Sequence, residues 1–119
     1  MKINFIINKE DYNSTLDYSI LTFLFKKIKD NTDIKIVDVN NFKCENVSIN
    51  FFLGTINNLL LKHAKCNILI PNNHVFKRND IPFLNNFDYI FCKSQTLTTL
   101  LENYVNKEKI KYISWRSTD

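Results

Sequence analysis

Short apolar runs alternate with helical patterns along this chain. Residues 2–7 form a nearly continuous apolar run with β-branched side chains, which predicts a strand buried on both faces. Further runs predict five more strands, at 33–39, 47–53, 67–70, 87–92 and 111–113. The pattern therefore predicts six strands separated by other structure.

Helical spacing of apolar residues occurs between these runs. A first helix follows the capping side chains of residues 13–15, and a second, short helix follows Thr55. A third helix begins at Ser94 or Gln95, whereas residues 72–86 are expected to be irregular with one helical turn. The residues expected on the buried side of the third helix are Leu97, Leu100, Leu101, Tyr104 and Val105.

Strands that alternate with helices favour right-handed crossovers between parallel strands. We therefore expect a single Rossmann-like domain over residues 1–119. It would be an α/β fold with an open, mostly parallel six-stranded sheet and helices on both faces. Ligands of such sheets bind outside the carboxyl ends of the strands. The loops expected to line that edge are 8–13, 54–57, 71–76 and 93–95.

The composition excludes several classes of nucleotide site. Gly54 is the only glycine, whereas a dinucleotide fingerprint needs three glycines and a phosphate-binding P-loop needs two. The chain also has eighteen asparagines and fourteen lysines against two arginines. We interpret this bias as the codon usage of an AT-rich genome rather than as a functional signal.

Charge and cysteine content limit the partners and the cellular location that we expect. The net charge of +4 comes from dispersed lysines, which favours a solvated surface over a nucleic-acid groove, so no nucleic-acid partner is expected. Three cysteines without CxxC spacing predict free thiols in a reducing compartment. No signal peptide, membrane span or metal-ligand spacing is evident, so we expect a cytoplasmic protein without a metal site.

Two side chains at the expected ligand edge could take part in chemistry. His74 follows the fourth strand, where it could act as a general base toward a hydroxyl, contact a phosphate, or be an ordinary loop histidine. Lys93 follows the fifth strand and could hold an anionic group or be an ordinary surface lysine. The residues alone leave these alternatives open.

The order of elements from residue 51 to residue 119 resembles a known family. The segments are FFLGTINNLLLKHAKCNILIPNNHVF, FDYIFCKSQTLTTLL and IKYISWRSTD, and they resemble the amino-terminal domain of GT-B glycosyltransferases of the kind found in large viruses and related microbes. Tyr18 and Ser19 resemble the start of the family's first helix. Three further motifs of the family match residues of this chain. They are Pro71 and Asn72 in the first motif, Asp88, Cys92 and Lys93 in the second, and Ser117 and Asp119 in the third.

The resemblance implies transfer of a sugar from a nucleotide-sugar to a hydroxyl, on the acceptor side of a two-domain enzyme. His74 would be the catalytic base, and the substrate-binding residues would be Asn72, Asn73, Lys93, Ser117 and Asp119. The family's second domain binds the nucleotide-sugar, so we expect a truncated half that is inactive alone. It would need a donor-binding domain or partner chain and no cofactor of its own. If the chain is viral, its location would be the host cytoplasm.

Two alternatives belong to other classes. The first is a non-catalytic α/β protein-interaction module that associates with itself or another protein. Its exposed apolar residues would be Phe42, Phe76, Phe83 or Trp115. The second is a nucleotide-binding regulator of flavodoxin-like topology, which ranks lower because the expected acidic cluster and phosphate loop are missing.

Overall fold

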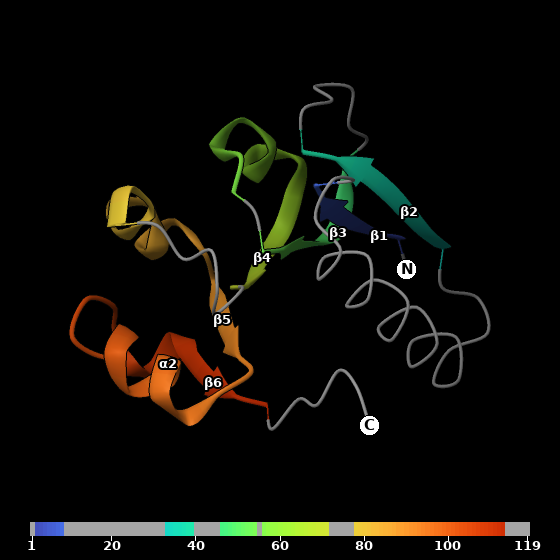
Figure 1. Cartoon of the computed structure of the whole chain (residues 1–119). Helices are drawn as coiled ribbons and strands as arrows, with labels where there is room; N and C mark the ends of the chain where they lie inside the picture. The colour runs from blue at the N-terminus through green and yellow to red at the C-terminus, as the bar shows by residue number, and fades with distance from the viewer. Residues whose placement is uncertain (1, 9–32, 40–45, 55, 72–77, 114–119) are drawn as a thin grey trace.

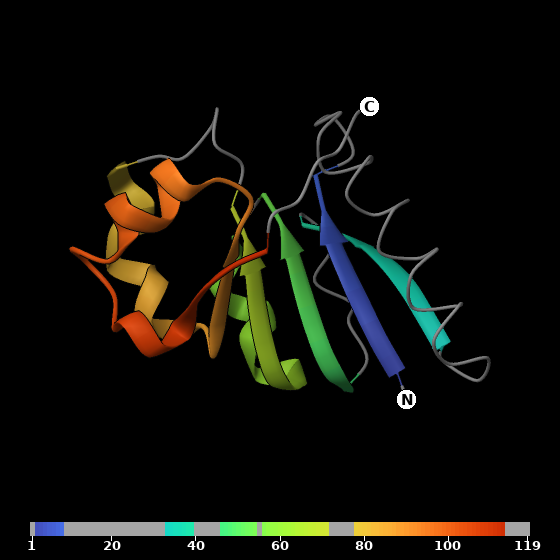
Figure 2. The ribbon, with the colours of Figure 1, turned by 90° about the horizontal axis from the view of Figure 1, so that it is seen from below.

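The computed structural model describes residues 2–8, 33–39, 46–54, 56–71 and 78–113 (Figure 1). These residues contain six strands in one sheet of order β2-β1-β3-β4-β5-β6, and every neighbouring pair is parallel (Figure 2). The fold is the expected α/β, Rossmann-like open sheet. The strands are β1 (Lys2–Ile7), β2 (Asp33–Asp38), β3 (Val47–Leu53), β4 (Ala64–Ile70), β5 (Tyr89–Cys92) and β6 (Ile110–Tyr112).

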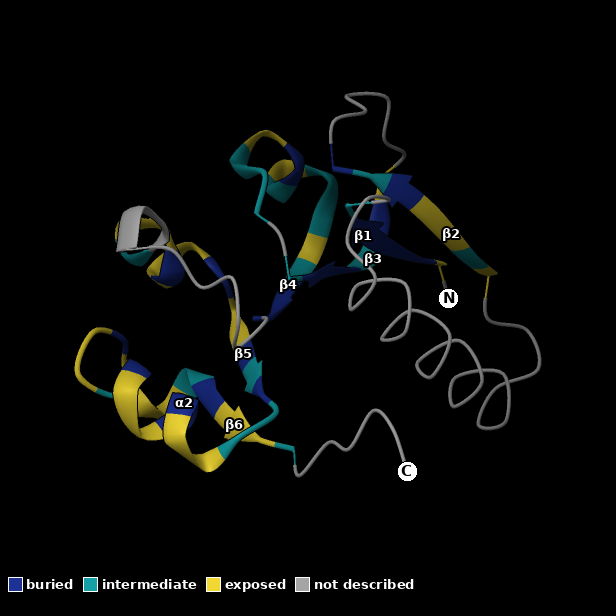
Figure 3. Cartoon of the chain, viewed as in Figure 1, coloured by how far each residue is buried: buried dark blue, intermediate teal, exposed yellow. Residues whose placement is uncertain are grey.

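Both faces of the sheet are buried, which explains the continuous apolar runs of the central strands (Figure 3). On one face, the cluster around Ile6, Phe52 and Leu69 continues into leucines of the helices. On the other face, Phe5, Phe51 and Ile68 belong to a second cluster. Alternate side chains of the same strands therefore feed two separate cores.

The described helices are mostly short 3-10 segments. They are η1 (Asn58–His63), η2 (Arg78–Asn86), α2 (Gln95–Leu101) and η3 (Lys107–Lys109). The first three contribute Leu60, Leu84, Leu97 and Leu101 to the same core cluster. The helix expected after residues 13–15 lies outside the described residues. No helix in the described part of the chain has the length and apolarity needed to cross a membrane.

Several expected boundaries were wrong. β4 begins three residues before Asn67, because its register with β3 extends down to Ala64 opposite Val47. The helix after β3 is capped by Asn57, whose side chain accepts a hydrogen bond from the Leu59 amide, and it is a 3-10 helix. Thr55, the expected cap, lies outside the described residues.

The third helix also differs from its expected form. It begins at Gln95, one of the two predicted starts, and Ser94 is its N-cap. It ends at Leu101, so Tyr104 is not on its buried side. Leu100 and Tyr104 are 45% and 48% exposed, whereas Val105 turns back into the core. β5 and β6 are also displaced from their expected bounds: β5 begins two residues later, and β6 begins one residue earlier, at Ile110.

Candidate functional site

The strand order places a topological switch point between β1 and β3. These strands are neighbours, while β2 lies on the far side of β1 and β4 lies on the far side of β3. Their connections therefore leave in opposite directions, and the carboxyl ends of these two strands form the kind of switch point at which α/β proteins bind ligands. Asn8 follows β1 there, and Gly54 follows β3.

Gly54 makes the turn at this edge. Its φ of 71° is in the left-handed region, which disfavours any residue with a Cβ atom. Its amide donates a hydrogen bond of 2.8 Å to the carbonyl of Ile70 at the end of β4. The only glycine of the chain thus turns the backbone away from β3 and leaves no side chain over the strand ends.

An asparagine side chain joins the elements that meet at this edge. Asn57 Nδ2 donates to the carbonyl of Val39 at 2.7 Å, and the amide of Val39 donates to the carbonyl of Ile7 at 2.7 Å. These bonds join the start of η1 to the ends of β1 and β2. In the next residue, Asn58 Oδ1 is buried without a hydrogen-bond partner among the described residues.

Lys93 lies at this edge as predicted. It follows β5 directly, is half-buried, and precedes Ser94, whose Oγ accepts a hydrogen bond of 3.2 Å from the Leu97 amide. β5 is two strands from β3, so Lys93 stands roughly 10 Å from the switch point at the usual strand spacing. The other candidates, His74, Asn72, Asn73, Ser117 and Asp119, lie outside the described residues.

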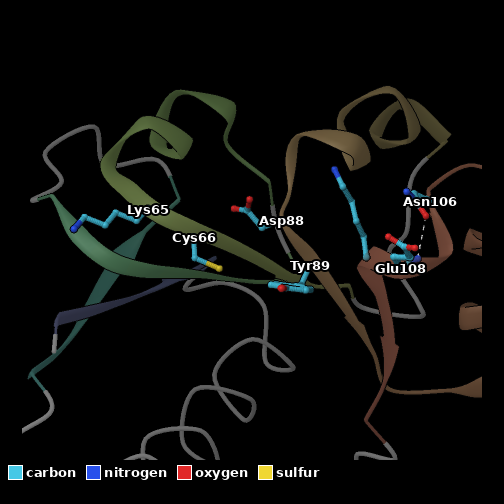
Figure 4. A pocket seen from close by; sticks show the side chains of 7 residues that line it. Lys65, Cys66, Asp88, Tyr89, Asn106 and Glu108 are labelled. Atoms are coloured by element: carbon cyan, nitrogen blue, oxygen red, sulfur yellow. Dashed lines mark hydrogen bonds between the residues drawn. The ribbon is translucent and has the colours of Figure 1, made fainter.

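The opposite edge of the sheet holds a cleft that sequence reasoning missed (Figure 4). It arises because β5 begins at Tyr89 opposite Ile68, while β4 begins four residues earlier at Ala64. Its volume is about 460 Å³. The residues that line it are Lys65, Cys66, Asp88, Tyr89, Asn106, Glu108 and Lys109.

Asp88 closes the sheet at the bottom of this cleft. Its Oδ2 accepts a hydrogen bond of 2.7 Å from the Asn67 amide, in the place of a strand carbonyl, and its own amide donates to the Asn67 carbonyl at 2.9 Å. Lys109 Nζ donates to the carbonyl of Asn85 at 2.9 Å. Two charged side chains of the cleft, Asp88 and Lys109, therefore already form hydrogen bonds with the backbone of the chain.

The cleft does not contain an activated nucleophile among its described residues. Burial raises the pKa of the Cys66 thiol, and the nearby negative charge of Asp88 raises it further. The thiol is therefore protonated at neutral pH and weakly nucleophilic. Cys92 is buried, and burial also raises the pKa of its thiol, although a hydrogen bond with Thr98 acts in the opposite direction.

A row of buried asparagines, called the asparagine ladder below, runs across three neighbouring strands of the sheet, between their amino and carboxyl ends. Asn4, Asn50 and Asn67 occupy matching positions on β1, β3 and β4 and are 1%, 0% and 7% exposed. Asn4 Nδ2 donates to Asn50 Oδ1 at 3.1 Å, and Asn50 Nδ2 donates to Asn67 Oδ1 at 3.2 Å. These three asparagines therefore have a structural role inside the sheet.

The ladder also holds η1 on the sheet. Asn50 Nδ2 donates to the carbonyl of Leu60 at 3.0 Å, and Asn67 Nδ2 donates to the carbonyl of Leu61 at 2.9 Å. One sequence signal could have revealed it, because asparagine takes the second position in INFII, INFFL and CNILI, the segments at 3–7, 49–53 and 66–70. The repeated position implies one row across three parallel strands.

Comparisons with known proteins gave no match. No protein-family model, curated protein or solved structure matches this chain. Among the described residues, no group of three or more His, Cys, Asp and Glu side chains could hold a metal ion.

Proposed function

We propose that this chain is the acceptor-side domain of a GT-B-like glycosyltransferase and binds a hydroxyl-bearing saccharide at the carboxyl edge of its sheet. The observation that carries the proposal is the switch point between β1 and β3, where the Gly54 turn and the Asn57 side chain lie. Amide groups donate and accept hydrogen bonds, as recognition of a sugar hydroxyl requires. Two motif positions of the resemblance, Pro71 and Lys93, directly follow β4 and β5 at this same edge.

In the proposed reaction a sugar hydroxyl of the acceptor attacks the anomeric carbon of a nucleotide-sugar. His74 takes the hydroxyl proton, a new glycosidic bond forms, and the bond to the nucleotide diphosphate breaks. Asn72, Asn73 and Lys93 hold the acceptor, together with Ser117 and Asp119. A donor-binding domain or partner chain holds the nucleotide-sugar, and the chain needs no cofactor of its own.

Acceptor binding and turnover test the proposal separately. In amide NMR spectra of the isotope-labelled chain, maltotriose or cellobiose should shift the Gly54 and Lys93 signals in a saturable manner. Lys93→Met should weaken this response, whereas Lys107→Met should not, because Lys107 is exposed on η3. Turnover of UDP-glucose by the chain alone would contradict the need for a partner. Absence of any saccharide response at the carboxyl edge would contradict the acceptor role.

A protein-interaction role is the second candidate, and exposed apolar side chains favour it. Phe83, one of the four residues expected to be exposed, is 40% exposed, while Phe42, Phe76 and Trp115 lie outside the described residues. Tyr112 on β6 is 49% exposed. Light scattering of the purified chain should reveal a dimer if this candidate is correct, and a monomer at all concentrations would count against self-association.

A further inference from the structure

A small hollow opens where β3 and β4 begin, at the edge opposite the proposed saccharide site. Its volume is about 260 Å³, which corresponds to roughly nine water molecules at about 30 Å³ each. It is lined by the last residues of η1 and the first residues of the two strands. These residues are Asn46, Val47, Lys62, His63, Ala64 and Lys65.

The charged side chains among the described residues that line this hollow are all basic. Two lysines and a histidine line it, and no carboxylate is present among its described lining residues. His63 Nδ1 lies 3.1 Å from Asn46 Oδ1, and because an amide oxygen only accepts, Nδ1 carries the proton of this bond. The ring is therefore held by Asn46, and its Nε2 is left for another partner.

The backbone that carries the side chains of Lys62 and His63 is held in place by hydrogen bonds. Buried amides of the asparagine ladder hydrogen-bond the carbonyls of Leu60 and Leu61, immediately before Lys62. The Ala64 amide also donates to the Leu61 carbonyl and closes the last turn of η1. Lys62 and His63 thus lie between two points that are attached to the sheet. The carbonyls of Leu60 and Leu61 precede them, and β4 follows them from Ala64.

We propose that this hollow binds a phosphate group, held by the ammonium groups of Lys62 and Lys65 and by the ring of His63. The site is separate from the proposed glycosyl-transfer edge, since it lies at the amino ends of the strands. A phosphate dianion matches the two positive charges of these lysines, and hydrogen bonds between charged partners are the stronger kind. Free phosphate and phosphorylated small molecules share this chemistry.

Titration with inorganic phosphate tests the site directly. The His63 ring protons and the Ala64 amide should shift in a saturable manner at millimolar phosphate, whereas sodium chloride at the same ionic strength should not produce this response. The variant Lys62→Gln/Lys65→Gln should weaken phosphate binding about tenfold or more, because two charge-assisted hydrogen bonds are lost. Lys107→Gln/Lys111→Gln removes the same charge elsewhere and should bind phosphate as the unmodified chain does.

The arms of the experiment separate the outcomes. Tighter binding of glycerol phosphate than of inorganic phosphate assigns the hollow to a phosphorylated small molecule, and equal binding assigns it to free phosphate. Equal shifts with chloride, or equal affinity in both double variants, would overturn the site. Amide spectra of the variants establish that they are folded. Because the readout is at His63 and Ala64, failure here leaves the saccharide test at Gly54 and Lys93 intact.

Discussion

Replacement of Asn50 by alanine tests how far the asparagine ladder holds the fold. Asn50 is fully buried and makes three hydrogen bonds, so Asn50→Ala removes one buried hydrogen bond from each of three groups. These groups are Asn4 Nδ2, the carbonyl of Leu60 and Asn67 Oδ1. A buried polar group costs about 1–3 kcal/mol where it is left fully unsatisfied, so roughly 3–9 kcal/mol is the upper bound for the three losses together.

The lower part of that range is expected. Removal of the amide leaves a polar space with three hydrogen-bonding groups around it, and a water molecule in such a space recovers part of the loss. We therefore expect Asn50→Ala to lower the free energy of unfolding by about 3–5 kcal/mol. Since domains of this kind unfold with about 5–15 kcal/mol, the variant should lose a large share of its stability.

Urea unfolding followed by circular dichroism measures this loss. The unfolding midpoint should fall while the dependence on urea stays unchanged, and the melting temperature should drop by roughly 12–20 °C. Asn103→Ala is the matched control, because Asn103 is exposed, and it should change the free energy by less than about 0.5 kcal/mol. If the two variants unfold alike, the ladder does not stabilise the fold as argued.

Three further predictions concern single side chains. Burial raises the pKa of the Cys92 thiol, so the folded state is favoured while the thiol is protonated and loses stability as the pH rises through alkaline values. Cys92→Ala should therefore weaken the dependence of the unfolding free energy on pH, measured by urea unfolding. The same pH dependence in the variant and the unmodified chain would contradict this reasoning. Gly54→Ala should lower the free energy of unfolding by about 1–2 kcal/mol, since φ is 71°, and Gly54→Asn should be milder; equal unfolding midpoints would refute the strain argument. Ser94→Ala should cost about 1 kcal/mol through loss of the cap to the Leu97 amide, whereas Ser94→Asp should retain most of the stability.

The central strands were predictable because their physics is local. β1 and β3 have the predicted bounds, since nearly continuous apolar runs are typical of strands buried on both faces of a parallel sheet. The start of β4 was not predictable from its own residues, because Ala64, Lys65 and Cys66 join the sheet through pairing with β3. Pairing between distant segments determined that boundary, and hydrophobic pattern did not.

The candidate site was predictable only in outline. The carboxyl edge follows from alternating strands and helices, and Lys93 lies there, but the roles proposed for the residues of this edge stay predictions. The amino-edge cleft and hollow depend on where β5 begins and on how η1 meets β4, which are tertiary facts. The buried role of Asn50 was hidden for another reason, because asparagine is abundant throughout the chain and usually marks turns.

The ladder explains how one short segment can serve two edges of the sheet. η1 starts at the carboxyl edge, where Asn57 Nδ2 bonds the Val39 carbonyl, and it ends at the amino edge beside Lys62 and His63. A 3-10 helix of six residues has poor hydrogen-bond geometry and little stability of its own. Buried amides from Asn50 and Asn67 fix its carbonyls in place of longer helical hydrogen bonding. The polar row inside the sheet therefore helps to position both the switch-point edge that we propose for a saccharide and the hollow that we propose for phosphate.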